Sequence, residues 1–214
     1  MGETRSGPFA GDLDPLSNPA DWDRLYERED PDRLPWTWQE LDPDLAAAFD
    51  HVGHLDGRVL DLGTGPGTQA IALARRGFHV VGSDLSPAAI AKARQRAEAA
   101  GVRVELVVDD ILDTKLPPGF AAIVDRGVFH LFPPEVRPRA VQALRHLLEP
   151  AGWLLLKTFS ILHEAETGPH RFTRSEILAL FEPWFEPVAI ADTTFHGTLD
   201  AFPKALFAVL RRAR

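Results

Sequence analysis

The stretch that decides the fold is GRVLDLGTGPGTQ, residues 57–69. An apolar strand reaches Asp61, and three glycines then follow at alternate positions, Gly63, Gly65 and Gly67. Glycine accepts positive φ angles and has no Cβ, so its backbone can pass close to a ligand. The pattern predicts a strand, a tight turn and a helix, with a small-molecule site at the turn.

The glycines are spaced G-x-G-x-G, whereas the dinucleotide-binding motif is G-x-G-x-x-G. A carboxylate at Asp61 would also repel a pyrophosphate. Asp84 ends the run FHVVGSD, about twenty positions later, where an acid can accept hydrogen bonds from ribose hydroxyls. These residues favour a nucleoside with positive charge and no phosphate, such as S-adenosylmethionine, over a nicotinamide dinucleotide. The alternative is a tight turn that contains an incidental acid.

Length and composition limit the possible classes of protein. The 214 residues suit one domain with an added arm. The chain has no cysteine, which excludes disulfides, thiolate catalysis and cysteine-ligated metals. The sequence shows neither a signal peptide nor an apolar run of about 18 residues, so we expect a cytoplasmic protein without membrane contact.

Negative charge gathers at the start of the chain. The formal net charge is −8, and residues 1–50 hold thirteen acidic side chains against four arginines. An acidic chain of this kind is a poor partner for nucleic acid. We expect residues 1–52 to form an N-terminal arm with cap helices over the active site, and residues 53–214 to form the core.

Beyond the arm, strand-like and helix-like runs alternate. Strands are expected near 58–62, 78–83, 103–108, 120–125 and 152–159, and helices near 67–76, 87–100, 134–148 and 173–182. Two further runs, VAIADTTF and KALFAVLRR, have no helix between them and should pair as an antiparallel hairpin at the sheet edge. The alternation predicts a Rossmann-like, doubly wound, mostly parallel α/β sheet with helices on both faces.

The glycine motif within this series of strands resembles the class I S-adenosylmethionine-dependent methyltransferases. That family has a seven-stranded sheet whose last two strands form an antiparallel edge. WDRLY at 22–26, PW at 35–36 and DRG at 125–127 are similar, more loosely, to thiopurine S-methyltransferases and their tellurite-resistance relatives.

The resemblance assigns the cofactor pocket residue by residue. It implies that the motif glycines and Asp61 hold the methionine moiety of S-adenosylmethionine, and that Asp84, with Leu85 beside it, contacts the ribose. Asp110 and Ile111 would lie by the adenine, although Asp109 could take the place of Asp110. After methyl transfer the same pocket would hold S-adenosylhomocysteine.

The segment FAAIVDRGVFHLFPP, residues 120–134, corresponds to the family's fourth strand and the residues beside the reactive methyl group. Asp125, Arg126 and His130 are its candidate catalytic residues, Asp125 also touches the cofactor, and Phe129 is a candidate substrate contact. Each has a simpler alternative: loop ordering for Asp125, a salt bridge for Arg126 and packing for His130.

Other candidate substrate contacts lie in two separate segments. The arm supplies Trp22, Tyr26 and Trp36, whose aromatic faces suit a sulfonium or simply anchor the arm. The loop SILHEAETGPHRF, residues 160–172, supplies His163 and His170. Its histidines and glutamates lack the spacing of a metal motif, so no metal is expected.

The sequence therefore predicts a methyltransferase acting on a small molecule, as a monomer or homodimer. The active-site segment offers no obvious catalytic lysine or acid pair. A soft acceptor such as sulfur needs little base catalysis, whereas hydroxyls and amines usually need a proton acceptor. An O- or N-methyltransferase is the alternative enzyme, and a cofactor-sensing binding protein is the alternative without catalysis.

Overall fold

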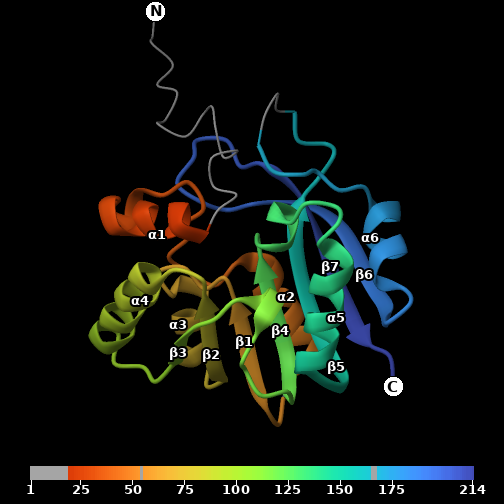
Figure 1. Ribbon diagram of the computed structural model, residues 1–214, viewed down its shortest axis with the longest axis horizontal. Helices are drawn as coiled ribbons and strands as arrows, with labels where there is room; N and C mark the ends of the chain where they lie inside the picture. Colours follow the sequence, from red (N-terminus) through yellow and green to blue (C-terminus); the bar gives the residue numbers. More distant parts are fainter. Residues whose placement is uncertain (1–18, 54, 165–167) are drawn as a thin grey trace, which may run out of the picture.

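The computed structural model describes residues 19–53, 55–164 and 168–214. In these residues one sheet has the strand order β3-β2-β1-β4-β5-β7-β6 (Figure 1). The strands are β1 (Arg58–Leu62), β2 (His79–Asp84), β3 (Glu105–Val108), β4 (Phe120–Arg126), β5 (Leu148–Phe159), β6 (Phe185–Thr194) and β7 (Lys204–Arg212). The first five are parallel, and β7 runs antiparallel to its neighbours β5 and β6. The predicted doubly wound sheet with an antiparallel edge is confirmed.

The α-helices are α1 (Pro19–Arg28), α2 (Pro43–Val52), α3 (Thr68–Arg75), α4 (Pro87–Ala99), α5 (Arg137–Leu147) and α6 (Arg174–Phe181). Several begin at the caps that the sequence contains. The Ser86 hydroxyl accepts the Ala89 amide at 3.0 Å, and Thr173 with Glu176 forms a complete capping box. The described residues also form the short 3-10 helices η2 (Pro31–Arg33), η3 (Ile111–Asp113) and η4 (Phe129–Leu131).

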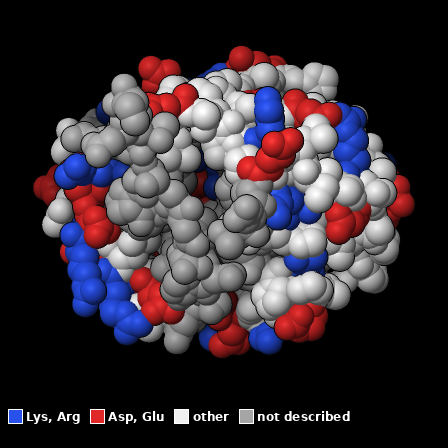
Figure 2. All heavy atoms as spheres, turned by 90° about the horizontal axis from the view of Figure 1, so that it is seen from above, with Lys and Arg blue, Asp and Glu red and all other residues white. Residues whose placement is uncertain are grey.

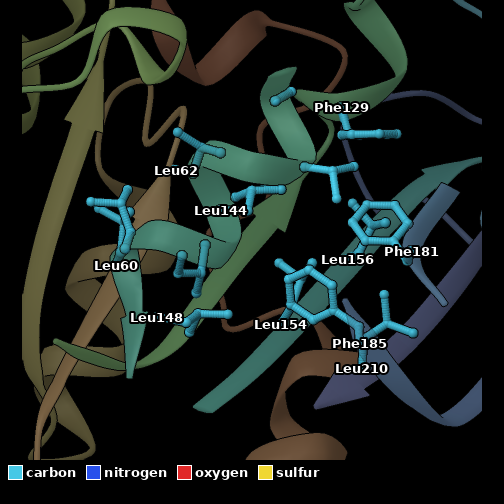
Figure 3. Packing of buried hydrophobic residues seen from close by; sticks show 14 of the residues in the cluster. Leu60, Leu62, Phe129, Leu144, Leu148, Leu154, Leu156, Phe181, Phe185 and Leu210 are labelled. Atoms are coloured by element: carbon cyan, nitrogen blue, oxygen red, sulfur yellow. The ribbon is translucent and has the colours of Figure 1, made fainter. Parts of the chain in front are cut away.

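Apolar side chains cover both faces of the sheet, because successive strand residues point in opposite directions. Leu60 and Leu154 pack with α5 and α6 on one face, where Phe181 and Phe185 complete a large cluster (Figure 3). Val59 and Leu155 pack on the other face against α2 and α3. The sheet is thus buried on both sides, as parallel sheets usually are.

Several boundaries differ from the predicted ones, and α5 and β5 show the physical reasons. The helix expected from residue 134 begins at Arg137, because Pro133 and Pro134 precede it and Pro138 occupies its first turn. The strand expected from residue 152 begins at Leu148, which pairs with Phe120 before a break in register. The 3-10 helices were not predicted, since each is one turn held by local hydrogen bonds.

The parallel strands β1, β2 and β4 all end at the side of the sheet that α1 covers (Figure 1). This edge is therefore where the candidate residues of the site come together. In the described parts of the chain, no helix combines the length and the apolar character needed to cross a membrane.

Candidate functional site

The glycine loop between β1 and α3 has the backbone that the motif predicts. Gly63, Gly65 and Gly67 adopt φ angles of 64°, 53° and 82°, a region that other residues avoid. A Cβ at Gly63 would lie 2.1 Å from Cγ2 of Val128, and one at Gly65 would lie 2.8 Å from the Tyr26 hydroxyl. The loop is therefore closely packed against β4's end and the arm.

Asp61 lies under this loop with its side chain almost fully buried. Its Oδ2 accepts the Thr64 hydroxyl at 2.6 Å, which ties the strand end to the turn. Burial raises the pKa of Asp61 to about 6. The carboxyl group can thus change its charge state near neutral pH in response to a cation placed beside it.

Asp84 ends β2 beside the glycine loop. Its two carboxylate oxygens accept the Gly65 amide at 2.8 Å and the Ser86 amide at 2.9 Å. Burial is the largest influence and raises the pKa of Asp84. A carboxylate has about four acceptor sites, so Asp84 can accept a ribose hydroxyl beside the Gly65, Ser86 and Leu85 amides.

The other predicted cofactor contacts follow β2 and β3. Leu85 is an exposed apolar side chain directly after Asp84. Asp110 caps η3 by accepting the Leu112 amide at 2.8 Å, whereas Asp109 accepts the Lys115 amide at 2.8 Å. Both acids order this loop, and their contact with a ligand stays a prediction.

Asp125 is the second-last residue of β4 and is fully buried. Its carboxylate accepts three backbone amides, from Gly127 at 3.1 Å, Val128 at 2.8 Å and Phe129 at 3.1 Å. Burial outweighs these bonds and raises the pKa of Asp125 to about 7. In the structure, these hydrogen bonds shape the turn that packs Val128 against Gly63.

This shift gives a prediction about pH. The folded state holds the Asp125 proton more tightly than the unfolded state, so this group's contribution to the free energy of unfolding falls as pH rises from about 4 to about 7. Asp125→Asn does not ionise, so relative to wild type it should gain stability between about pH 5 and about pH 8. Urea unfolding at both pH values measures the difference.

The control for this comparison is Asp113→Asn. A hydrogen bond from Lys115 lowers the pKa of Asp113, so that variant should show no such relative gain. Equal pH dependence of the Asp125→Asn variant and the wild type would contradict the buried, proton-binding carboxyl.

Arg126 is held by the protein through all three of its guanidinium nitrogens. Nε donates to Asp42 Oδ2 at 2.8 Å, Nη1 to the Trp36 carbonyl at 3.0 Å, and Nη2 to the His196 carbonyl. Its side chain is 7% exposed. Arg126 also lines the small cavity over the glycine loop, together with Asp61. The salt bridge considered for it from sequence is present, and its catalytic role stays a prediction.

His130 and Phe129 lie in η4, both buried. His130 Nδ1 accepts the Phe159 amide at 3.4 Å, and its ring packs against Phe159 and Phe195. Burial lowers the pKa of His130 to about 3. Phe129 packs in the core against Phe181, so its position supports a packing role rather than a substrate contact.

The arm covers the glycine loop with its aromatic side chains. Trp22 stacks with Tyr26 and meets Trp36 edge to face, and Trp36 Nε1 lies 3.2 Å from the Tyr26 hydroxyl. The cavity that remains between Tyr26, Trp36 and the loop has a volume of about 40 Å³. Small-molecule sites usually enclose about 300–1,000 Å³, so Tyr26 and Trp36 leave little open space over the loop.

The loop after β5 brings its histidines to aromatic neighbours. His163 stacks on Phe159, and His170 lies edge-on to Phe172 while its Nε2 lies 3.3 Å from Glu176 Oε1. Glu166 of the same loop lies outside the described residues. Among the residues described, no group of three or more histidine, aspartate and glutamate side chains could hold a metal.

Other residues of the site were not singled out from the sequence. Asp23 accepts the Ser86 hydroxyl at 2.6 Å and so anchors α1 to the start of α4. Gln69 accepts the Asp42 amide at 2.8 Å and donates to the Glu40 carbonyl at 3.0 Å. Lys157 is fully buried and binds Asp42 and Asp44. The charge of Lys157 within WLLLKTF was the one available signal for its role.

The geometry suits a nucleoside ligand. Three positive-φ glycines, the Asp84 carboxylate that bonds the Gly65 amide, and the exposed Leu85 lie at one strand edge. Acidic and basic side chains are mixed on this face where it is described, and no extended basic patch is visible (Figure 2). The class that the fold and site define is thus a doubly wound, nucleoside-binding protein.

Comparison with known proteins gives the family. Residues 59–152 match the family model described as a methyltransferase domain. A thiopurine S-methyltransferase of Legionella pneumophila is 30% identical, with 69% of this chain and 74% of that protein covered. A 2-heptyl-1-hydroxyquinolin-4(1H)-one methyltransferase of Mycobacteroides abscessus is 28% identical, with 83% and 81% covered.

A structure solved for the conversion of a disulfide bond into a thioacetal group during echinomycin biosynthesis has a TM-score of 0.79 and 25% identity. The match covers 92% of this chain and 93% of that one. The chain belongs to the class I S-adenosylmethionine-dependent methyltransferases.

Proposed function

We propose that this protein transfers a methyl group from S-adenosylmethionine to a soft or already ionised atom, such as sulfur, of a small molecule. The observation that carries the proposal is that the predicted catalytic side chains are engaged elsewhere. Arg126 is ion-paired, Asp125 accepts three amides and His130 accepts a backbone amide. The thiopurine S-methyltransferase relative is consistent with such an acceptor.

When bound, S-adenosylmethionine supplies an electrophilic methyl group on a sulfonium. The chain's part is to bind, align and exclude water. Asp84, with Leu85 beside it, accepts the ribose hydroxyls, the glycine loop lies by the methionine moiety, and Asp110 lies by the adenine. Asp61, with its raised pKa, becomes fully ionised beside the ligand's cationic groups.

His130 is poorly suited to remove a proton. A group with a pKa of about 3 is a weak base at neutral pH. Because Nδ1 accepts the Phe159 amide, the neutral ring carries its proton on Nε2. An acceptor that loses its own proton in solution removes the need for a base. We therefore favour a thiol-like acceptor over an ordinary alcohol or amine.

The arm completes the site in this proposal. The described part of the arm covers the cofactor and excludes water, with Trp22, Tyr26 and Trp36 as its covering side chains. The predicted arm of residues 1–52 also includes residues 1–18, which lie outside the described residues. His163 and His170, in the loop after β5, remain candidate substrate contacts. A cytoplasmic location, where S-adenosylmethionine and small-molecule acceptors would both be present, stays a prediction.

The experiment is a product assay with S-adenosylmethionine and a panel of thiols, phenols and amines. Methylation of thiols at the highest rate supports the proposal. Preference for phenols or amines would favour the O- or N-methyltransferase alternative. Tight cofactor binding without any product would favour a cofactor-sensing protein.

His130→Gln tests the absence of a general base. On the best acceptor, kcat/KM should change by less than about tenfold, and the pH profile should keep its shape, whereas loss of a general base costs about 10²–10⁴-fold. His146→Gln, at an exposed position on α5, is the control. A loss of the larger size, specific to His130, would assign the base to it.

A further inference from the structure

Four charged side chains form a buried network beneath the arm. Lys157 Nζ lies 2.7 Å from Asp42 Oδ1 and 2.6 Å from Asp44 Oδ2, and Arg126 Nε lies 2.8 Å from Asp42 Oδ2. The side chains of Asp42 and Lys157 are fully buried. Burial alone would raise the pKa of Asp42, but Lys157 and Arg126 outweigh it, so the pKa is lowered. Asp42 is therefore held in its ionised form by these two cations.

Burying such charges is costly, and well-packed apolar residues often give equal or greater stability. A purely structural account of the network is therefore weak. What the network does is join segments that are distant in sequence. Asp42 begins α2 at the end of the arm, Arg126 ends β4, and Lys157 lies near the end of β5.

Two chain segments meet above the network. Arg126 donates to the carbonyls of Trp36 in the arm and His196 in the connection between β6 and β7. Next to these bonds, the Thr198 amide donates to the Pro35 carbonyl at 3.1 Å and the Thr198 hydroxyl to the Leu34 carbonyl at 3.1 Å. We call residues 34–38 and 195–198 the roof.

The approach within the roof is very close. A Cβ at Gly197 would lie 1.9 Å from the Pro35 carbonyl oxygen. Phe195 lies below, with its ring centroid 5.7 Å from both Arg126 Cζ and Lys157 Nζ. The same Trp36 lines the cavity over the glycine loop. The roof thus continues from the ion network to the cofactor site.

We infer that the Asp42–Lys157–Arg126 network is a positioning device: it fixes the position of the roof relative to the glycine loop. In this inference Lys157 is a positioning residue: it fixes Asp42, Asp42 fixes Arg126, and Arg126 fixes the two roof carbonyls. Its effect on cofactor affinity rests on the proposed function, whereas its effect on the roof does not.

The test uses the double variant Asp42→Asn/Lys157→Met in the full chain. Each single variant leaves the buried group with an unbalanced charge, which destabilises strongly. The double variant removes one negative and one positive charge, so the charges of Asp44 and Arg126 still sum to zero. The asparagine side chain at position 42 can still cap α2. Its melting temperature should therefore lie closer to that of wild type than either single variant's.

Two readouts follow on the folded double variant. Hydrogen exchange of the Thr198 amide should be at least about tenfold faster than in wild type, because the roof opens more often. The Kd for S-adenosylhomocysteine should rise by about tenfold or more, because a small displacement of the roof weakens its alignment with the ligand. Asp50→Asn/Arg76→Met removes an exposed ion pair between α2 and the end of α3 and should change neither readout.

Wild-type exchange at Thr198 in the double variant would overturn the inference. Faster exchange with unchanged affinity would overturn its extension to the cofactor. A wild-type protein that binds no S-adenosylhomocysteine would refute the proposed function instead, and the exchange measurement, which uses no ligand, would still decide the role of the network.

Discussion

Replacing Asp84 with alanine is expected to weaken S-adenosylhomocysteine binding by about 10- to 150-fold, which corresponds to roughly 1.5–3 kcal/mol for hydrogen bonds to a charged group. The variant removes the proposed ribose acceptor and also the bonds that hold the Gly65 and Ser86 amides. Isothermal titration measures the affinity.

Two further variants separate these effects. Asp84→Asn keeps one acceptor oxygen and should bind with intermediate affinity. Asp192→Ala removes an exposed acid on β6, which pairs with Arg174, and should bind as wild type does. Wild-type affinity in a folded Asp84→Ala variant would remove the ribose assignment.

The second large effect is expected at Gly63. A Cβ there would lie 2.1 Å from Val128 Cγ2 and would also have to accept a φ of 64°. Gly63→Ala should therefore lower the melting temperature and abolish measurable cofactor binding, because the end of β4 and the glycine loop can no longer pack together. Thermal unfolding and titration measure the two consequences.

Gly77 offers a control that isolates the clash. Its φ is 91°, and a Cβ there would meet nothing within 4 Å. Gly77→Ala thus carries the backbone strain of a positive φ without a steric overlap. If the two alanine variants lose equal stability and both bind the cofactor, the close approach at Gly63 is not what shapes the site.

Local patterns explain why the core could be predicted. Some features depend only on residues close together in the sequence, so a local pattern is enough to predict them. These are the glycine motif, the strand ending at Asp84 and the caps at Ser86 and Thr173. The antiparallel edge was predictable because no helix separates the last two strand-like runs. These features also allowed the family to be recognised before the fold was known.

The contacts of the site could be predicted less well, because they join distant residues. Arg126 is the last residue of β4, where the family places substrate contacts, yet its partners Asp42 and His196 come from the arm and the last connection. The burial of His130 and Phe129 depends on Phe159 and Phe181, which no local pattern indicates. Lys157 was visible as a charge in an apolar strand, but its partner was not.

The position of β7 has a consequence for synthesis of the chain. It lies between β5 and β6 but follows both in sequence. During translation, β5 therefore emerges with one edge that has no partner until residues 204–212 are made. An unpaired strand edge is prone to join other chains. Changes in the coding sequence that slow translation between β6 and β7 should thus lower the yield of native protein more than changes that slow translation earlier in the chain.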